Sequence, residues 1–142
     1  MSEHLDVSIE LDGRTQQASV RGDELLLETL RERFGRTSVR GTCGIGLCGT
    51  CTVELDGRAV SSCLTLAVQA DGRAVRTPEG DDPANTELDA VQRAFVEHAA
   101  YQCSFCIPGM VATVRSVLAV EPDATVESLR ESLGGNLCRC GT

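Results

Sequence analysis

The chain has 142 residues, eight cysteines and a formal net charge of −8, from 13 basic and 21 acidic residues. This length suits one ordinary domain or two small ones. The negative charge disfavours nucleic acid as a partner, because the phosphates would be repelled. Hydrophobic residues make up 42% of the chain but aromatic residues only 3%. A core built mostly from Leu, Val and Ala in two small domains needs additional stabilisation, and the cysteines are the candidates for it.

The start of the chain carries no pattern typical of export. Met1–Asp6 has neither a basic segment nor an apolar run, and no stretch of the sequence approaches 18 apolar residues, so no membrane segment is predicted. This start predicts a cytoplasmic protein, in which thiols are kept reduced. The cysteines therefore indicate metal ligation in preference to a disulfide framework.

The first 76 or so residues are predicted to form a mixed sheet with one helix. Residues 7–11 alternate between apolar and polar side chains, and Asp12-Gly13 predicts a hairpin that returns over residues 15–20. Asp23 is the predicted N-cap of a helix that Gly35 ends. The apolar face of this helix is formed by Leu26, Leu27, Leu30 and Phe34.

A glycine-rich loop, residues 41–49, separates this helix from a second predicted hairpin over residues 52–63, which turns at Asp56-Gly57. Residues 64–68 and 74–75 are predicted to add short extended or helical pieces. The next segment, Thr77-Pro78-Glu79-Gly80-Asp81-Asp82-Pro83, combines two prolines, a glycine and three acids, and it predicts a linker.

After the linker the apolar residues recur with the period of a helix. Three helices are predicted: one opened by Thr86, one with Pro108 in its first turn, and one capped by Thr125 and ended by Gly134-Gly135. The sequence therefore predicts an α+β protein, with a first domain over residues 1–78 and an all-helical second domain over residues 84–142.

The cysteines divide at the same boundary. Four precede the linker and four follow it: Cys43, Cys48, Cys51 and Cys63, then Cys103, Cys106, Cys138 and Cys140. Four thiolates are what one tetrahedral metal ion or one 2Fe–2S cluster needs. Each predicted domain thus has one candidate metal centre.

The first set has the spacing C-x₄-C-x₂-C, followed after eleven intervening residues by Cys63. This opening is the spacing of plant-type ferredoxins. Three ligands within nine residues require a tightly curled backbone, which Gly44, Gly46 and Gly49 permit. Zinc is disfavoured here, because the ligands of structural zinc sites usually come as two sequence-local pairs, whereas this set has three neighbouring cysteines and one distant one. The second set, C-x₂-C and then C-x-C, leaves zinc and a 2Fe–2S cluster open.

Three motifs of the chain resemble the iron–sulfur subunits of the xanthine oxidase family of molybdenum hydroxylases. Arg40–Val53 (RGTCGIGLCGTCTV) resembles the family's first-cluster motif, Gln102–Met110 (QCSFCIPGM) its second motif, and Gly135–Cys140 (GNLCRC) its third. The motifs occur in the family's order and the resemblance covers nearly the whole chain. It implies that the second set also holds a 2Fe–2S cluster.

The resemblance implies a β-grasp, ferredoxin-like N-terminal domain and a helical-bundle C-terminal domain. It also implies a large partner subunit with a molybdenum–pterin cofactor and, in many relatives, a third subunit with FAD. Electrons would pass from the molybdenum site to the cluster of the helical domain, then to the ferredoxin-like cluster, and on to FAD or another acceptor. The complex would be an oxidoreductase whose substrate site lies outside this chain. Gln102 stands where relatives hydrogen-bond the pterin.

Two departures from the family pattern are present. Ser104 and Ile107 replace a common Gly and Thr in the second motif, and Cys140 is followed only by Gly141-Thr142. Three helices are therefore expected, with a flank for a partner to cover. His4 and His98 are expected at the surface, because the cysteines already fill two sites. The alternative functions are a free-standing double-cluster ferredoxin or redox sensor, and a zinc-bound structural protein.

Overall fold

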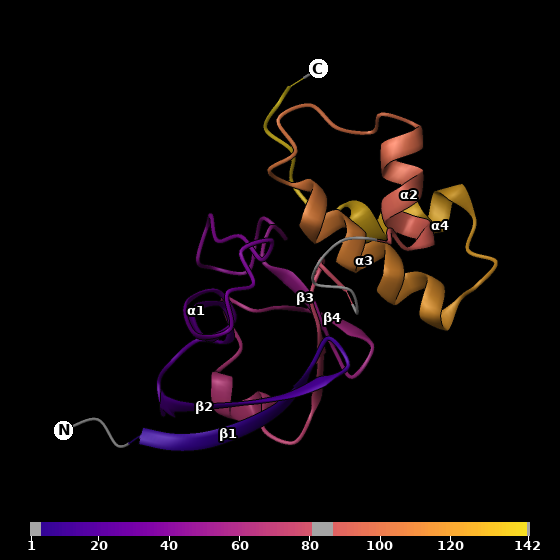
Figure 1. Cartoon of the computed structure of the whole chain (residues 1–142). Helices are drawn as coiled ribbons and strands as arrows, with labels where there is room; N and C mark the ends of the chain where they lie inside the picture. Colours follow the sequence, from indigo (N-terminus) through magenta and orange to yellow (C-terminus); the bar gives the residue numbers. More distant parts are fainter. Residues whose placement is uncertain (1–3, 81–86, 142) are drawn as a thin grey trace.

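The computed structural model describes residues 4–80, the N-terminal half, and residues 87–141, the helical half. A five-stranded sheet occupies the first and three helices the second, so the predicted α+β combination of a sheet-containing and a helical part is confirmed (Figure 1). The two ends of the chain lie at opposite ends of the molecule. Residues 81–83 of the predicted linker and the proposed start of the second domain at residue 84 lie outside the described residues.

The sheet has the strand order β2-β1-β5-β3-β4. Its strands are β1 His4–Leu11, β2 Arg14–Arg21, β3 Thr52–Leu55, β4 Arg58–Ser61 and β5 Ala74–Arg76. The pairs β1–β2, β3–β4 and β3–β5 are antiparallel, and β1–β5 is parallel. Both predicted hairpins are confirmed. Each turns through an Asp-Gly pair with positive φ at both residues, 49° and 74° at Asp12-Gly13 and 50° and 77° at Asp56-Gly57.

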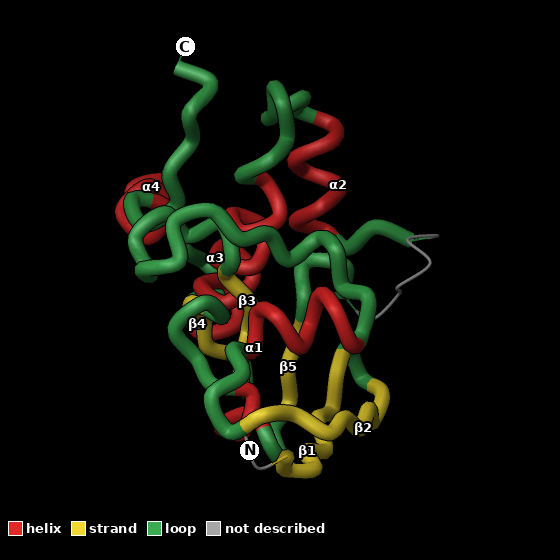
Figure 2. The backbone as a smooth tube through the Cα atoms, turned by 90° about the vertical axis from the view of Figure 1, so that its left-hand side faces the viewer, coloured by secondary structure: helices red, strands yellow, loops and turns green. Residues whose placement is uncertain are grey.

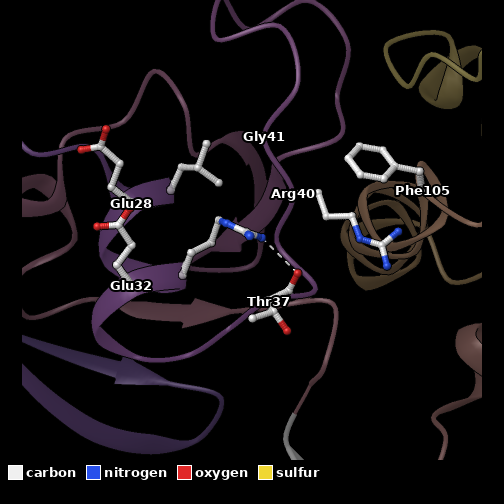
Figure 3. A pocket seen from close by; sticks show the side chains of 8 residues that line it. Glu28, Glu32, Thr37, Arg40, Gly41 and Phe105 are labelled. Atoms are coloured by element: carbon white, nitrogen blue, oxygen red, sulfur yellow. Dashed lines mark hydrogen bonds between the residues drawn. The ribbon is translucent and has the colours of Figure 1, made fainter.

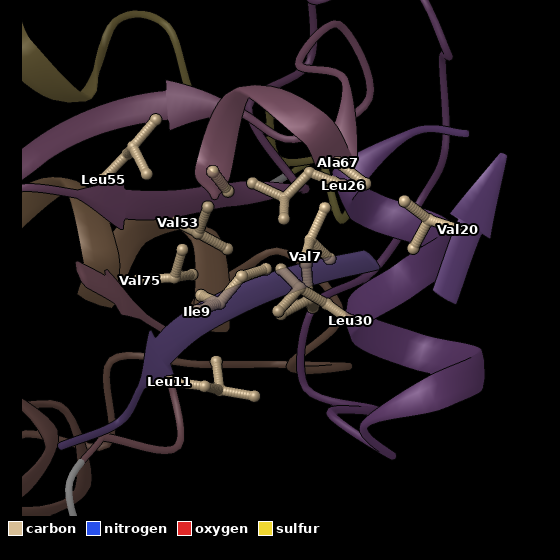
Figure 4. Close-up of a cluster of buried hydrophobic side chains, with 12 residues drawn as sticks. Val7, Ile9, Leu11, Val20, Leu26, Leu30, Val53, Leu55, Ala67 and Val75 are labelled. Carbon is tan, nitrogen blue, oxygen red and sulfur yellow. The ribbon is translucent and has the colours of Figure 1, made fainter. Parts of the chain in front are cut away.

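One helical segment packs across the sheet (Figure 2). It begins as α1, Leu26–Glu28, and continues as a π-helical turn, η1, Thr29–Arg33. Its buried side chains join those of the strands in a single core of aliphatic residues (Figure 4). The core residues are Val7, Ile9, Leu11, Val20, Leu26, Leu30, Val39, Val53, Leu55, Ala67, Ala70 and Val75. Ala67 and Ala70 belong to a short 3₁₀ helix, η2, Ala67–Ala70.

The predicted start of this helix is wrong and its predicted end is confirmed. The N-cap is Leu25, which has extended backbone angles and no side-chain cap. Asp23 does not cap, because its carboxylate accepts from Arg21 Nε at 3.0 Å instead. Gly35 follows the helix with φ at 66°, a left-handed conformation that glycine adopts without strain.

The helical half consists of α2 Ala90–Glu97, α3 Ile107–Val120 and α4 Val126–Leu133. Pro108 lies in the first turn of α3, and Thr125 caps α4 by accepting from the Ser128 N–H at 3.2 Å, as predicted. Thr86, the predicted start of α2, lies outside the described residues. The prediction is wrong, because α2 begins at Ala90. Asp89 is the N-cap and forms a reciprocal capping box with Gln92.

Helix α3 joins the two halves. It packs against α2 and α4 on the helical side and against β3 and β4 on the sheet side. Within the part of the chain that the structure describes, no helix has the length and apolar character needed to cross a membrane.

Candidate metal centres

The first cysteine set lies on the curled loop between η1 and β3. Gly44, Gly46 and Gly49 all have positive φ, between 67° and 72°, which confirms the role predicted for them. The curl directs backbone N–H groups at the sulfur of Cys43, and the Cys48 N–H lies 3.4 Å from it. These donors, first Ile45 and then Cys48, lower the pKa of the Cys43 thiol to about 6, so its thiolate is stabilised before any metal binds.

Cys63 completes this set from the chain just after β4. Its side chain is buried and adjoins that of Cys51, which is also buried. Burial, followed by the neighbouring Cys51 thiol, raises the pKa of Cys63 to about 11, while the Gly46 N–H opposes the rise. A thiol in this position needs a metal cation to become a thiolate at neutral pH.

The second cysteine set lies on the chain segments before α3 and after α4. Cys103 and Cys106 precede α3, with Cys106 as its N-cap, and Cys138 and Cys140 follow α4. The sulfurs of Cys103 and Cys140 are 3.5 Å apart. Burial, then the adjacent Cys138 thiol, raises the pKa of Cys106, whereas the Cys140 N–H lowers that of Cys138.

The eight thiols are all free, and those of each set lie close to one another. Cys43 contacts Cys48, Cys51 contacts Cys63, Cys103 contacts Cys140, and Cys138 contacts both Cys106 and Cys140. Within residues 4–80 and 87–141, no three Cys, His, Asp or Glu side chains converge on the position of a single metal ion. Four thiols in each half are a donor set that fits one 2Fe–2S cluster per half.

The two sets are in direct contact through the backbone. The Leu137 N–H donates to the carbonyl of Cys48 at 2.8 Å. The Asn136 side chain, also buried, donates to the carbonyl of Gly49 at 2.9 Å and accepts from the Thr113 hydroxyl at 2.9 Å. The loop of the first centre thus rests on the start of α3 and on the chain that leads into Cys138.

A second contact between the halves borders an open pocket of about 350 Å³ beside α1 (Figure 3). The Arg40 guanidinium lies 5.1 Å from the centre of the Phe105 ring and donates to the carbonyl of Ser104 at 2.7 Å. Arg31 lines the same pocket and donates to the carbonyl of Thr37 at 3.1 Å. Arg40 and Phe105 flank the first ligands of the two centres, so this contact also fixes one loop against the other.

Other residues that the sequence singled out lie at the surface. Gln102 is exposed and lines an open hollow of about 280 Å³ together with Cys106, Cys138 and Cys140. His4 and His98 are exposed, as expected. Sequence reasoning missed Asn136 and the buried Arg115 of α3. Asn136 stands inside a recognised motif, and Arg115 is a lone cation in an apolar stretch, so both carried a signal that was not used.

Two family descriptions divide the chain between them. Residues 9–77 match the 2Fe-2S iron-sulfur cluster binding domain, and residues 77–142 match the [2Fe-2S] binding domain. Each match contains one of the two cysteine sets.

Two known proteins of similar length resemble this chain in sequence over nearly its whole length. The small subunit of nicotine 6-hydroxylase from Paenarthrobacter nicotinovorans is 41% identical over 98% of this chain and 83% of its own. The xanthine dehydrogenase iron-sulfur-binding subunit of Escherichia coli O157:H7 is 40% identical over 98% of this chain and 87% of its own.

Solved structures agree with these relatives. Quinoline 2-oxidoreductase from Pseudomonas putida 86 superposes with a TM-score of 0.91 at 42% identity, over 98% of this chain and 85% of the matched one. The aldehyde oxidoreductase of Desulfovibrio gigas superposes with a TM-score of 0.88 at 36% identity, over 96% of this chain and 15% of that longer one. The chain therefore belongs to the iron–sulfur subunits of the xanthine oxidase family of molybdenum hydroxylases, as an electron-transfer subunit of an oxidoreductase with two 2Fe–2S clusters.

Proposed function

We propose that the four thiol pairs are the ligands of four irons, two irons in each half. Cys43 with Cys48 and Cys51 with Cys63 would hold the cluster of the N-terminal half. Cys103 with Cys140 and Cys106 with Cys138 would hold that of the helical half. The gathering of four thiols in each half carries this proposal, and the match of each half to a 2Fe–2S binding domain supports it. Each bound cluster supplies one-electron redox chemistry.

The residues around the two sets prepare them differently. In the N-terminal half, backbone N–H groups stabilise the charge of Cys43, and the burial of Cys51 and Cys63 keeps water away. In the helical half, Cys103 and Cys138 are exposed. An exposed ligand edge shortens the distance to a redox partner, so the helical half is the side proposed to face the large subunit.

We propose that this large subunit carries a molybdenum–pterin cofactor and that Gln102 hydrogen-bonds the pterin. Gln102 adjoins Cys103 in sequence and shares a hollow with three further ligand candidates. Its amide offers both a donor and an acceptor, which complement the mixed edge of a pterin. Electrons would then pass from the helical half to the N-terminal half and on to a subunit with FAD or to another acceptor.

The finer description of the fold belongs to the same proposal. The N-terminal domain would be a β-grasp domain over residues 1–78, and the second a helical bundle over residues 84–142. The parallel pairing of β1 with β5 and the helical segment across the sheet support the first. The packing of α2 and α4 on α3 supports the second. A cytoplasmic location is proposed because eight metal-binding thiols are maintained in a reducing compartment.

Iron analysis tests the cluster assignment directly. Purified protein should contain about four irons and four acid-labile sulfides per chain and absorb visible light. Zinc in place of iron, or about two irons, would contradict it. A large molybdenum-containing subunit should copurify with the natural protein, and its absence would favour the free-standing ferredoxin.

Single substitutions test which cysteine belongs to which centre. Cys48→Ser should abolish one paramagnetic signal of the reduced protein and largely spare the other, because each ligand set lies in its own half. Cys106→Ser should do the reverse, so each variant is the control for the other. Loss of both signals from either change, in a protein that remains folded by circular dichroism, would show that the ligands are shared differently.

A further inference from the structure

Arg40 carries a positive charge from the loop of the first cysteine set to the loop of the second. It lies three positions before Cys43. Its Nη1 group donates to the carbonyl of Ser104 at 2.7 Å, and Ser104 lies between Cys103 and Cys106. Resting on the ligand assignment above, we propose that Arg40 is a positioning residue for the cluster of the helical half. Its hydrogen bond holds the loop that carries Cys103, and its charge raises the reduction potential of that cluster.

Ser104 has a backbone conformation that its surroundings must hold. Its φ is 65°, in the left-handed region that a residue with a Cβ atom rarely adopts, and such strain persists only where neighbouring contacts fix it. The Arg40 hydrogen bond fixes the carbonyl of this residue. The same guanidinium lies 5.1 Å from the centre of the Phe105 ring, so Arg40 contacts two successive residues of the second loop (Figure 3). The segment between Cys103 and Cys106 is thus held from the N-terminal half of the chain.

The charge of Arg40 favours the reduced state of a cluster bound beside it. Reduction of a 2Fe–2S cluster adds one electron and therefore one negative charge. Arginine remains protonated at neutral pH, so its positive charge attracts the added electron. Its hydrogen bond also offsets the negative end of the Ser104 carbonyl dipole. Because this contact is partly buried, solvent screens it less than a contact at the surface. Removal of the charge should therefore lower the reduction potential of the helical-half cluster.

Arg40→Gln, made in the full chain with both clusters loaded, tests the electrostatic effect. Titration with dithionite in the presence of redox mediators, followed by the paramagnetic signals, gives the potential of each cluster. The signal that Cys106→Ser abolishes belongs to the helical half. For that cluster we expect the equilibrium constant for one-electron reduction to fall about threefold to tenfold, which is about 30–60 mV. The potential of the other cluster should change by a smaller amount.

Arg31→Gln is the matched control. Arg31 lines the same pocket as Arg40 and loses the same charge, but its hydrogen bonds go to carbonyls of the N-terminal half, Thr37 at 3.1 Å and Val39 at 2.6 Å. This control should leave the helical-half potential unchanged. Equal shifts in Arg31→Gln and Arg40→Gln, no shift in Arg40→Gln, or a larger shift of the N-terminal cluster would overturn the electrostatic role.

Arg40→Lys separates the charge from the shape of the side chain. Lysine keeps the cation but lacks the planar guanidinium that lies over the Phe105 ring. The helical-half potential of Arg40→Lys should therefore lie close to that of the unsubstituted protein. A shift as large as that of Arg40→Gln would show that the effect is structural and would refute a role for the charge.

Ser104→Gly tests the positioning role. Glycine adopts a positive φ without strain, so the loop should then depend less on Arg40. In the presence of a chelator, Arg40→Gln should lose the helical-half signal severalfold faster than the unsubstituted chain, and adding Ser104→Gly should remove most of that difference. Equal loss with and without Ser104→Gly would overturn the positioning role. If Arg40→Gln purifies without this cluster, the potential is measured in the Ser104→Gly background. Failure of the ligand assignment would appear separately, as fewer than about four irons in the unsubstituted chain.

Discussion

Glu24 is a carboxylate at the start of the helical segment that is almost fully removed from water. It accepts from Arg33 Nε at 2.6 Å and Arg33 Nη2 at 2.7 Å, and from the Thr29 hydroxyl at 2.9 Å. The paired Arg33 hydrogen bonds, opposed by burial and aided by Thr29, lower the pKa of Glu24 to about 2. The lower pKa in the folded state means that this group stabilises the fold when ionised.

The stabilisation by Glu24 depends on pH, because only the ionised carboxylate provides it. The stabilisation is present above the ordinary carboxyl pKa of about 4.5 and is lost as the pH falls toward 2. Glu24→Gln should lower the free energy of unfolding by about 1–3 kcal/mol at pH 7. The deficit should shrink below pH 4. Urea unfolding followed by circular dichroism measures both, with Asp23→Asn, an exposed carboxylate, as control. An equal deficit at pH 7 and pH 3 would contradict this explanation.

Gln102 is the residue through which the chain is proposed to meet the pterin. Gln102→Ala should keep both paramagnetic signals and slow substrate-driven reduction of the centres in the assembled enzyme. A neutral hydrogen bond is worth only about 0.5–1.5 kcal/mol net, so the subunits should still assemble. Rapid-mixing kinetics measure the rate, with Gln17→Ala on the exposed part of β2 as control. An unchanged rate with unchanged cofactor content would leave Gln102 an ordinary surface residue.

At the scale of elements, the contact between α3 and the loop before β3 is set by glycine. Gly109 lies in the first turn of α3, where alanine would favour the helix by about 1 kcal/mol. The added Cβ would nevertheless lie 2.3 Å from the carbonyl oxygen of Gly49, 3.1 Å from that of Thr50 and 3.2 Å from Thr50 Cα. Backbone atoms are the obstacle, so rotation of a side chain cannot relieve it.

Gly109→Ala should therefore destabilise the protein by about 1–3 kcal/mol in spite of its helix propensity. Gly135→Ala is the matched control, because a Cβ there would meet nothing within 4 Å. Urea unfolding of the two variants measures the difference. A Gly109→Ala variant as stable as the control would show that α3 can shift away from the loop at little cost.

The elements that sequence reasoning predicted correctly are those with a local cause. The two Asp-Gly hairpins and the Thr125 cap depend only on residues within one turn, and all three are confirmed. The predicted Asp23 cap was wrong because a neighbouring arginine competes for its carboxylate. Nothing in the spacing of Leu26, Leu30 and Phe34 distinguishes the observed π-helical turn from an α-helix, since the difference is a single residue in the hydrogen-bond register.

The candidate sites divide in the same way. Cysteine spacing and glycine content are local, and they located the thiols that the structure brings together in each half. Asn136 bonds to Gly49, 87 residues away, and Arg115 bonds to Thr77, 38 residues away. Their partners are backbone atoms of distant segments, which no residue pattern identifies. Such contacts exist only in the folded chain, where the two halves lie side by side.

On the scale of the whole molecule, a buried polar network connects the halves beyond the cysteine loops. Asp12 of the first hairpin turn accepts from the Thr77 N–H at 2.7 Å and the Thr77 hydroxyl at 2.9 Å. The carbonyls of Thr77 and Pro78 then accept from Arg115 at 3.0 and 3.2 Å. Arg115 is 5% exposed and forms an ion pair with Asp89, the N-cap of α2.

This network makes Arg115 the side chain that fixes the direction in which the chain leaves the sheet. Arg115→Ala would remove the donor of two carbonyls and leave the partly buried Asp89 with only the more distant Arg76 guanidinium, 3.9 Å away. Because Asp89 is partly exposed, the loss of these charged hydrogen bonds should cost about 1–3 kcal/mol. Burial raises the pKa of Asp89, but the Gln92 N–H and then Arg115 lower it, and the net result lies below the ordinary value. The variant should therefore also raise the pKa of Asp89.

The loss of stability in Arg115→Ala should affect mainly the helical half, because the N-terminal half keeps its own aliphatic core. In Arg115→Ala, the paramagnetic signal that Cys106→Ser abolishes should disappear at a lower urea concentration than the other. In the unsubstituted protein the two signals should be lost more nearly together. Arg130→Ala is the control, since this arginine of α4 is 73% exposed and pairs with Glu127, which is equally exposed. If both signals of Arg115→Ala were still lost together at an unchanged midpoint, the network would not couple the halves.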